Sequence, residues 1–212
     1  MEESLDFFLN QYLEENAEPE PPLLKSLNRE THIKVLKPRM LSGHLQGRFL
    51  SMMSKFIRPN KILEIGTYTG YATLCLAEGL TDKGEIITLE ANPEHLILAR
   101  KYFSQSPIGH KIRVLEGLAI DLIPQIQERF DLVFIDADKK SNRIYFEMVL
   151  DKVNPGGLIM VDNVLWSGKI LKGDSDAKTR EIRDFNEFIH NHNQVESFIL
   201  PLRDGITLIR KH

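Results

Sequence analysis

Short apolar runs alternate with helix-like segments along most of this chain, from about residue 43 to residue 161. The runs are too short and too strongly hydrophobic to keep one face in water, so they predict strands buried on both faces. They cover residues 61–65, 85–89, 112–116, 131–135 and 158–161. Buried strands separated by helices predict a parallel sheet with helices on both sides, a doubly wound α/β fold.

Helical patterns fill the segments between these strands, and proline, glycine and asparagine mark their ends. We expect helices over residues 43–57, 71–80, 92–105, 119–128 and 142–153. Asn92-Pro93-Glu94 is the clearest start, because it joins a capping side chain, a proline at the first helical position and an acid that suits the helix dipole. Asn154-Pro155-Gly156-Gly157 predicts the turn into the fifth strand.

The last part of the chain has a different pattern. Residues 195–200 and 206–210 predict two more strands, and the five residues between them are too few for a crossover helix. The two strands must therefore pair antiparallel. The predicted fold is a mostly parallel sheet of seven strands that ends in an antiparallel hairpin.

The first part of the chain predicts two helices. Residues 4–15 and 23–35 have helical patterns, and Glu18-Pro19-Glu20-Pro21-Pro22 separates them. With 212 residues, of which 42% are hydrophobic, the chain can bury one substantial core. We expect a single domain (1–212), in which residues 1–38 form a helical arm or lid and residues 39–212 form the core.

Composition narrows the class of protein. The chain has 27 basic and 30 acidic residues, a net charge of −3, which does not favour a broad nucleic-acid surface. Its one cysteine, Cys75, lies on an apolar helical face, so we expect a buried thiol and a reducing compartment. No apolar run is long enough to span a membrane, and the acidic N-terminus is unlike a secretory signal. We expect a cytoplasmic protein.

A glycine turn follows the first predicted strand, with the pattern Glu64-x-Gly66-x-x-x-Gly70. Such a turn lets backbone amides approach a ligand closely. Tyr68 stands where a dinucleotide-binding turn needs its second glycine, and Glu64 suits a cation better than a phosphate. S-adenosylmethionine carries an ammonium and a sulfonium and has no phosphate. Glu90, at the end of the second strand, can accept hydrogen bonds from ribose hydroxyls. An ordinary strand-to-helix turn is the alternative.

Acidic and amide side chains follow two strands that should be neighbours. Asp136 comes after the fourth strand, and Asp162-Asn163 come after the fifth. Donors that are all oxygen favour magnesium, or calcium or manganese, over zinc. The alternative is that Asp136 and Asp138 cap a helix and Asp162-Asn163 form a turn. Because both groups should meet at one sheet edge, we favour the metal.

Lys139 lies three residues after Asp136. By default a lysine here is solvated, as we expect for its neighbour Lys140. Beside a divalent cation and a sulfonium, however, its charged form would be disfavoured. It could then take a proton from a hydroxyl that the metal has acidified.

These motifs resemble those of the cation-dependent O-methyltransferases of the catechol and caffeoyl-CoA type. The matching segments are LEIGTYTGY at 63–71, FIDADK at 134–139, VDNVLWSG at 161–168 and DGIT at 204–207. The resemblance spans about residues 39–210. It implies a class I, Rossmann-like methyltransferase that uses S-adenosylmethionine and a divalent cation, and it favours a homodimer.

The resemblance also implies residue roles. Asp136, Asp162 and Asn163 would bind the metal, and Lys139 would be the catalytic base. The residues at the cofactor would be Met40, Glu64, Gly66, Tyr68, Ala72, Glu90, Ala119 and Asp136. Ala72 stands where many members carry a serine that bonds the cofactor carboxylate. Ala137 replaces the histidine of the animal catechol enzymes, and their acidic substrate-side residue has no match, so a catecholamine is not implied.

The expected reaction is methyl transfer to one hydroxyl of a vicinal diol on a small aromatic ring, with residues 1–38 and Trp166 as candidates for the cover. The first alternative acceptor is a hydroxylated uridine in transfer RNA. It would use a basic edge made of Arg39, Arg48, Lys55, Arg58 and Lys61. A non-enzymatic scaffold that only binds the cofactor is a second alternative. A dehydrogenase is the weakest, because the turn lacks the required glycines.

Overall fold

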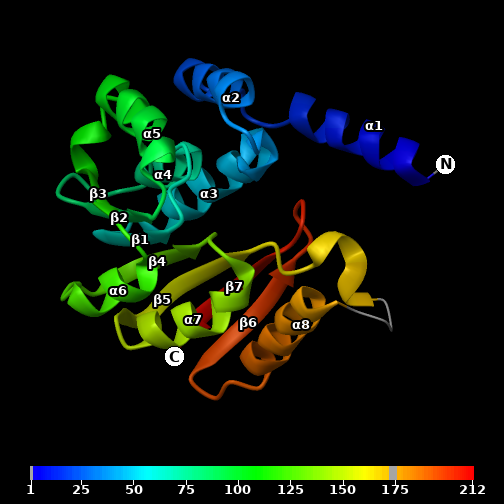
Figure 1. Cartoon of the computed structure of the whole chain (residues 1–212), viewed down its shortest axis with the longest axis vertical. Coiled ribbons are helices and arrows are strands. Elements are labelled where there is room, and N and C mark those ends of the chain that lie inside the picture. Colours follow the sequence, from blue (N-terminus) through cyan, green and yellow to red (C-terminus); the bar gives the residue numbers. More distant parts are fainter. Residues whose placement is uncertain (1, 172–175) are drawn as a thin grey trace.

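The computed structural model describes residues 2–171 and 176–212, and this part of the chain forms one seven-stranded sheet (Figure 1). The strand order is β3-β2-β1-β4-β5-β7-β6. Strands β1 to β5 pair in parallel, and β7 lies antiparallel between β5 and β6. The strands are β1 (Lys61–Ile65), β2 (Glu85–Glu90), β3 (Ile112–Glu116), β4 (Phe130–Ile135), β5 (Val153–Asp162), β6 (Val195–Leu200) and β7 (Ile206–Lys211). The predicted sheet and its final hairpin are confirmed.

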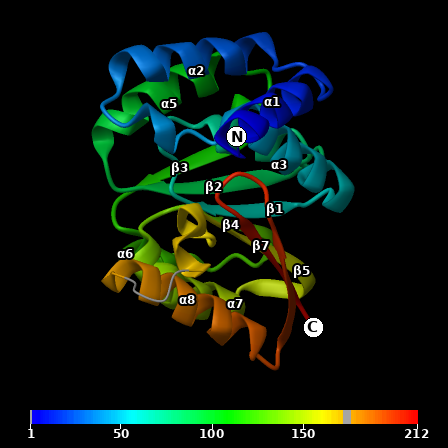
Figure 2. The same ribbon diagram turned by 90° about the vertical axis from the view of Figure 1, so that its right-hand side faces the viewer.

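Two helical layers cover the sheet (Figure 2). One layer holds α2 (Pro22–Lys34), α3 (Gly43–Ile57), α4 (Tyr71–Ala77) and α5 (Pro93–Gln105). The other holds α6 (Ala119–Leu122), α7 (Asn142–Leu150) and α8 (Ala177–His190). Side chains of β1 alternate between two apolar clusters, with Ile62 in the first and Leu63 and Ile65 in the second. This period of two aims Glu64 at the α4 side of the sheet.

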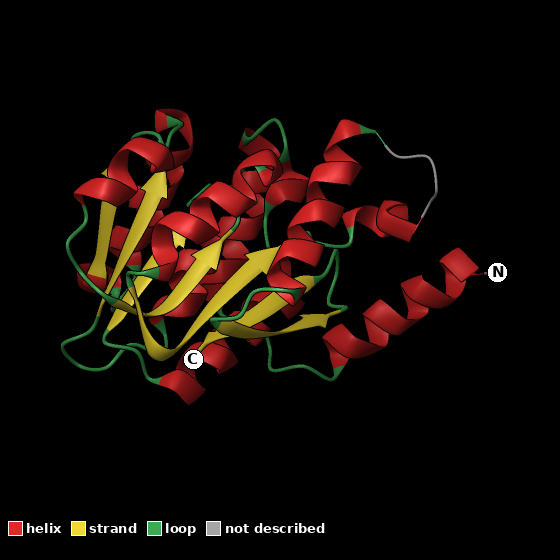
Figure 3. Ribbon diagram, turned by 90° about the horizontal axis from the view of Figure 1, so that it is seen from below, coloured by secondary structure: helices red, strands yellow, loops and turns green. Residues whose placement is uncertain are grey.

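The first helix, α1 (Glu2–Glu15), extends away from the rest of the chain (Figure 1 and Figure 3). Helix α2 instead packs on α4 and α5. Within the described residues, no helix is long and apolar enough to cross a membrane. Short 3-10 turns complete the chain at Pro38–Met40, Gly109–Lys111, Ile123–Gln125, Lys139–Ser141 and Trp166–Leu171.

Strand order creates the edge at which the site can form. Strands β1 and β4 are neighbours, and the chain leaves them toward opposite sides of the sheet. Beyond them, β4 and β5 pair in register, with Ile135 opposite Val161. The next residues, Asp136 and Asp162, therefore emerge side by side at the carboxyl edge of the sheet. The predicted neighbourhood of the first, fourth and fifth strands is confirmed.

Many predicted element bounds are confirmed, and Asn92 caps α5 as expected, since its side chain accepts from the Glu94 N–H at 3.0 Å. Three helices end earlier than predicted. Helix α6 ends at Leu122 and gives way to a 3-10 turn that contains Pro124, whose ring and missing N–H do not suit a helix interior. Helix α4 ends at Ala77, and Glu78 and Gly79 continue only with i→i−3 bonds of 3.3 Å.

Helix α7 was also predicted too long, and the turn predicted after it was wrong. The helix ends at Leu150, and strand β5 already begins at Val153. Residues 154–157 lie inside this strand as an irregularity, because Phe130 pairs with Val153 whereas Leu132 pairs with Leu158. Gly156 takes φ +77° there, so the turn-forming residues make a bulge rather than a loop.

Candidate active site

The turn after β1 requires glycine at Gly66. Its φ is +101°, and a Cβ built there would lie 2.2 Å from the Asp136 carbonyl oxygen. Its N–H donates to Leu89 O at 2.9 Å, while the Asp136 N–H donates to Ile65 O at 2.9 Å. The residue therefore sits where the ends of β1, β2 and β4 meet, and any side chain would push them apart.

Glu64 is fully buried beneath this turn. Its Oε2 accepts from the hydroxyls of Thr73 and Thr88, each at 2.5 Å. Its Oε1 is buried and has no hydrogen-bond partner among the described residues. Burial raises the pKa of Glu64 to about 8. A buried carboxylate with a spare acceptor has room for a hydrogen-bond donor, above all a cationic one.

Glu90 holds the turn from the end of β2. Its Oε2 accepts from the Tyr68 N–H at 2.7 Å and its Oε1 from the Asn92 N–H at 2.9 Å. Tyr68 itself lies at φ +49°, and its hydroxyl donates to Lys37 O at 2.9 Å. The side chain of His95 lies against both, 3.4 Å from Glu90 Oε1 and 4.7 Å from the Tyr68 ring centre. Glu90 Oε2, whose one donor among the described residues is the Tyr68 N–H, keeps a lone pair for a further donor.

The other predicted cofactor residues are more scattered. Ala72 is buried in the first turn of α4. Ala119 begins α6, two residues after Gly117, whose N–H donates to Glu90 O at 2.8 Å. Met40 is 53% exposed on the segment before α3. In the structure, Glu64, Gly66, Tyr68 and Glu90 therefore lie close together at the turn after β1. Ala72, Ala119 and Met40 lie farther out.

Asp136 and Asp138 have different local roles. Lys139 Nζ lies 2.8 Å from Asp136 Oδ1, and both side chains are mostly buried. Asp138 accepts instead from the hydroxyls of Ser141 and Tyr145, at the start of the following helix. Asp138 precedes the 3-10 turn Lys139–Ser141, but its side chain makes no capping hydrogen bond there, so the capping interpretation is wrong for Asp138, whereas Asp136 lies at the sheet edge with the lysine.

Asp162 ends β5 next to Asp136 and is 4% exposed. Its Oδ2 accepts from Gln46 Nε2 at 2.8 Å and its Oδ1 from the Asn163 N–H at 2.8 Å. Burial, and then the nearby Asp136 carboxylate, raise the pKa of Asp162 to about 6. Asn163 has φ +61°, a left-handed conformation that asparagine tolerates well. Two carboxylates that disfavour each other's charge are an environment that a cation would stabilise.

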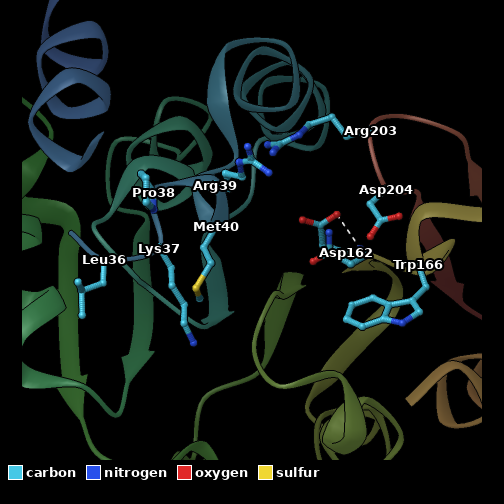
Figure 4. A pocket seen from close by; sticks show the side chains of 10 residues that line it. Leu36, Lys37, Pro38, Arg39, Met40, Asp162, Trp166, Arg203 and Asp204 are labelled. Atoms are coloured by element: carbon cyan, nitrogen blue, oxygen red, sulfur yellow. Dashed lines mark hydrogen bonds between the residues drawn. The ribbon is translucent and has the colours of Figure 1, made fainter. Parts of the chain in front are cut away.

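A pocket of about 550 Å³ opens beside Asp162 and Asn163. Figure 4 shows residues 36–40 on one side of it, and Trp166, Arg203 and Asp204 on the other, with Asp162 between them. Trp166 Nε1 is buried and has no hydrogen-bond partner in the described structure. Met40, Asp162, Asn163 and Trp166, all singled out from the sequence, line this one space.

No three His, Cys, Asp or Glu side chains converge on a common point within residues 2–171 and 176–212. The groups at this edge that could bind a metal are the carboxylates of Asp136 and Asp162 and the amide of Asn163, and all three would bind through oxygen. Such a set suits a hydrated hard cation that keeps several waters, as magnesium does, better than a closed protein cage.

Several residues whose side chains contact Glu64 or Asp162 were not identified from the sequence. Thr73 and Thr88 bond Glu64 from a helix and a neighbouring strand, and Gln46 reaches Asp162 across 116 positions of sequence. Cys75, by contrast, is buried as predicted, and burial raises the pKa of its thiol to about 12. No local motif marks Thr73, Thr88 or Gln46, because their partners come from distant elements.

This chain is similar in sequence to known O-methyltransferases. A family model described as O-methyltransferase matches residues 13–212. Caffeoyl-CoA O-methyltransferase 2 of Zea mays is 36% identical over 205 residues, which cover 91% of this chain and 77% of the maize protein. Catechol O-methyltransferase of Niastella koreensis is 36% identical over 162 residues, 74% of this chain and 73% of that protein.

Solved structures have the same fold. The methyltransferase PaMTH1 of Podospora anserina, bound to SAH, has a TM-score of 0.92 at 27% identity, covering 100% of this chain and 97% of its own. The O-methyltransferase of Bacillus cereus in complex with SAH has a TM-score of 0.88 at 31% identity, covering 96% and 97%. On its sequence match over nearly its whole length, this chain belongs to the O-methyltransferase family.

Proposed function

We propose that this protein is a divalent-cation-dependent O-methyltransferase that moves the methyl group of S-adenosylmethionine to one hydroxyl of a catechol-like small molecule. The observation that carries the proposal is the in-register exit of Asp136 and Asp162 from β4 and β5, beside the Gly66 turn. Membership of the O-methyltransferase family, and likeness to structures that hold SAH, support the reaction class.

The turn after β1 has the chemistry to hold the cofactor. The unpartnered Oε1 of Glu64 can accept from the ammonium of a methionine group, and that positive charge would favour the ionised carboxylate. The spare lone pair on Glu90 Oε2 suits a ribose hydroxyl. The full proposed set is Met40, Glu64, Gly66, Tyr68, Ala72, Glu90, Ala119 and Asp136.

The proposed metal ligands are Asp136, Asp162 and Asn163. Their oxygens match the preference of magnesium, with calcium and manganese as alternatives. The raised pKa of Asp162 beside Asp136 supports the choice, because a cation between two repelling carboxylates would relieve that repulsion. When bound, such a cation would make a coordinated hydroxyl more acidic.

Lys139 is the proposed base. Its Nζ lies 2.8 Å from Asp136 Oδ1, so it stands at the same edge of the sheet as the proposed ligands. In its neutral amine form, Lys139 would accept the proton of the acceptor hydroxyl at Nζ. The resulting oxyanion would attack the sulfonium methyl as its bond to sulfur breaks, so that S-adenosylhomocysteine leaves as a neutral thioether, and the protein would mainly orient the two reactants.

The size of the pocket supports a small aromatic acceptor. A space of about 550 Å³ lies within the range that accommodates small ligands. The Trp166 indole gives it a flat aromatic wall, and Met40 an apolar one (Figure 4). Leu36, Lys37 and Pro38 line the same side as Met40, opposite Trp166, which supports a covering role for the end of the N-terminal segment.

Transfer RNA is the less supported acceptor. Of the cations expected to form a basic edge, Arg48 and Lys55 pair with Glu78, at 2.7 and 2.8 Å, and Lys61 pairs with Glu85 at 2.8 Å. Cations that are already paired have less charge to offer to phosphates. We therefore keep the small molecule as the proposed acceptor.

The test is a methyl-transfer screen. The protein would be incubated with methyl-labelled S-adenosylmethionine and either a panel of diphenols or bulk transfer RNA, each with magnesium or with EDTA. Labelled diphenol that forms only with magnesium is the expected result. Label on RNA alone would favour the alternative acceptor. Tight cofactor binding without transfer to anything would favour a non-enzymatic scaffold.

A further inference from the structure

Gln46 is a buried amide in helix α3 that touches a proposed metal ligand. The residue is 1% exposed, and its Nε2 donates to Asp162 Oδ2 at 2.8 Å. Its Oε1 accepts from Arg203 Nη1 at 3.3 Å. Both ends of the amide are therefore occupied, which is what a buried polar group requires.

The negative charge of Asp162 and the positive charge of Arg203 allow only one orientation of the Gln46 amide. A carboxylate only accepts hydrogen bonds, and a guanidinium only donates them. The NH₂ group of Gln46 must then face Asp162 and its oxygen must face Arg203. The neutral amide thus links a cation to a buried anion, and the two ionic partners polarise it in the same sense.

Arg203 is itself held in position. It belongs to the loop between β6 and β7, and its Nη1 also donates to Leu41 O at 2.9 Å. Leu41 directly follows Met40 on the pocket wall. The chain of hydrogen bonds therefore joins the pocket wall, the hairpin loop, helix α3 and the end of β5.

These contacts determine the orientation of the Asp162 carboxylate. Gln46 holds one oxygen and the Asn163 N–H holds the other, so the carboxylate plane cannot rotate without losing a bond. Each oxygen still has a lone pair for another partner. Outer-shell partners of this kind orient ligands in metal sites, and their loss commonly weakens metal affinity about 10- to 100-fold.

We propose that Gln46, held by Arg203, is a positioning residue that orients Asp162 for the divalent cation. This inference rests on the proposed cation-dependent function. The competing explanation is that Gln46 only satisfies a buried carboxylate, in which case its loss would lower stability and leave cation affinity as it is.

The experiment measures Mn²⁺ affinity of the cofactor-free protein by the loss of the free-ion EPR signal, alongside thermal unfolding without metal. Gln46→Leu keeps the approximate volume and removes both hydrogen bonds. We expect its Mn²⁺ Kd to rise about 10-fold or more. Ser54→Ala is the matched control on the same helix, because it removes a buried hydrogen bond to Leu76 O, of 2.6 Å, far from Asp162. Its Mn²⁺ affinity should equal that of the wild type.

A second variant, at the exposed residue Arg203, tests the same series of hydrogen bonds with less effect on folding. Arg203→Met should weaken Mn²⁺ binding in the wild-type background and have no further effect in Gln46→Leu, because the two residues act through one contact. Arg210→Met, on the adjacent strand, removes an exposed pair with Glu196 and serves as the control.

The outcomes separate the two levels of proposal. Wild-type Mn²⁺ affinity in Gln46→Leu or, should that variant not fold, in Arg203→Met would overturn the positioning role while the cation site stands. A wild-type protein that does not bind Mn²⁺ would overturn the cation site and the positioning role together.

Discussion

At the scale of single residues, Glu64 combines full burial with one oxygen that has no partner in the described structure. Its two hydrogen bonds come from threonine hydroxyls and do not offset the desolvation, so the pKa of Glu64 rises to about 8. The acid is therefore mostly protonated near neutral pH when no cationic ligand is present. That protonation makes the ligand-free protein sensitive to pH.

The first prediction concerns stability against pH. The unfolded chain releases the Glu64 proton near pH 4.5, whereas the folded protein keeps it until about pH 8. The contribution of Glu64 to the free energy of unfolding should thus be fully present below pH 4.5, decrease between pH 4.5 and 8 by about 1.4 kcal/mol per unit at most, and stay constant above. Urea unfolding of the wild type and of Glu64→Gln across this range is the measurement. Parallel curves for the two proteins would show that Glu64 does not titrate in this window.

The second prediction concerns Lys139. Lys139→Ala should slow methyl transfer by about 10²- to 10⁴-fold, the usual contribution of a general base. Because Lys139 contacts Asp136 and not the turn after β1, binding of S-adenosylhomocysteine by calorimetry should change little. Lys140→Ala alters the exposed neighbour and should turn over normally. Equal rates for Lys139→Ala and Lys140→Ala would remove Lys139 from the mechanism.

At the scale of elements, the site depends on how strand ends approach one another. Gly66 lets the backbone of the β1 turn meet that of β4, and the register of β4 and β5 brings two aspartates to one edge. Helix α3 then supplies the Gln46 amide to the second of them. Errors of one residue in register would turn either aspartate to the other face of the sheet.

The third prediction compares two glycines with positive φ. Gly168 has φ +71° and nothing within 4 Å of an added Cβ, so Gly168→Ala should cost only the backbone strain, about 1–2 kcal/mol. Gly66→Ala adds a contact of 2.2 Å with the Asp136 carbonyl oxygen and should cost clearly more, about 3 kcal/mol or above. Urea unfolding of both variants measures the difference. Equal costs would mean that the β1–β4 approach is not tight.

The fourth prediction concerns Asp136, the proposed metal ligand that directly follows β4. Asp136→Ala should abolish transfer and weaken Mn²⁺ binding while the protein stays folded, because the carboxylate lies at the sheet edge rather than in the core. Asp138→Ala removes the neighbouring carboxylate, whose contacts are with Ser141 and Tyr145, and should keep the dependence on the cation. Circular dichroism checks the fold of both. Normal turnover by Asp136→Ala would refute its role as a ligand.

At the scale of the whole molecule, the sheet divides the described chain into two layers, and the site lies at one edge of it between the pocket wall and the final hairpin. Arg203 and Leu41 join that wall to the hairpin loop. Helix α1 extends beyond this body, and Leu9, Tyr12 and Leu13 are exposed on it. The expectation that residues 1–38 form an arm or lid stays a prediction, since helix α2, within that range, packs on α4 and α5.

The fifth prediction is the oligomeric state. The homodimer expected from the sequence stays a prediction, and light scattering after size exclusion checks it against the chain mass of 24.4 kDa. A mass of twice that value is the expected result. A monomer at micromolar concentration would contradict it.

The sequence by itself determined the order of strands and helices, the glycine turn and the acidic residues at strand ends. Each of these signals lies within a few adjacent residues, and alternation alone leads to a doubly wound sheet. Local sequence patterns gave a wrong prediction where the same residues can form either of two local structures. Asn154-Pro155-Gly156-Gly157 makes a bulge in β5 because Val153 before it and Leu158 after it both pair with β4.

Only the tertiary structure decided which distant side chains meet. Glu64 finds its donors on α4 and β2, and Asp162 finds Gln46 on α3. Arg203 reaches Gln46 across 157 positions. Periodicity reports which face of an element is buried, but not the angle or depth at which that element packs on the sheet. Those contacts exist only once the layers have closed around the strand ends.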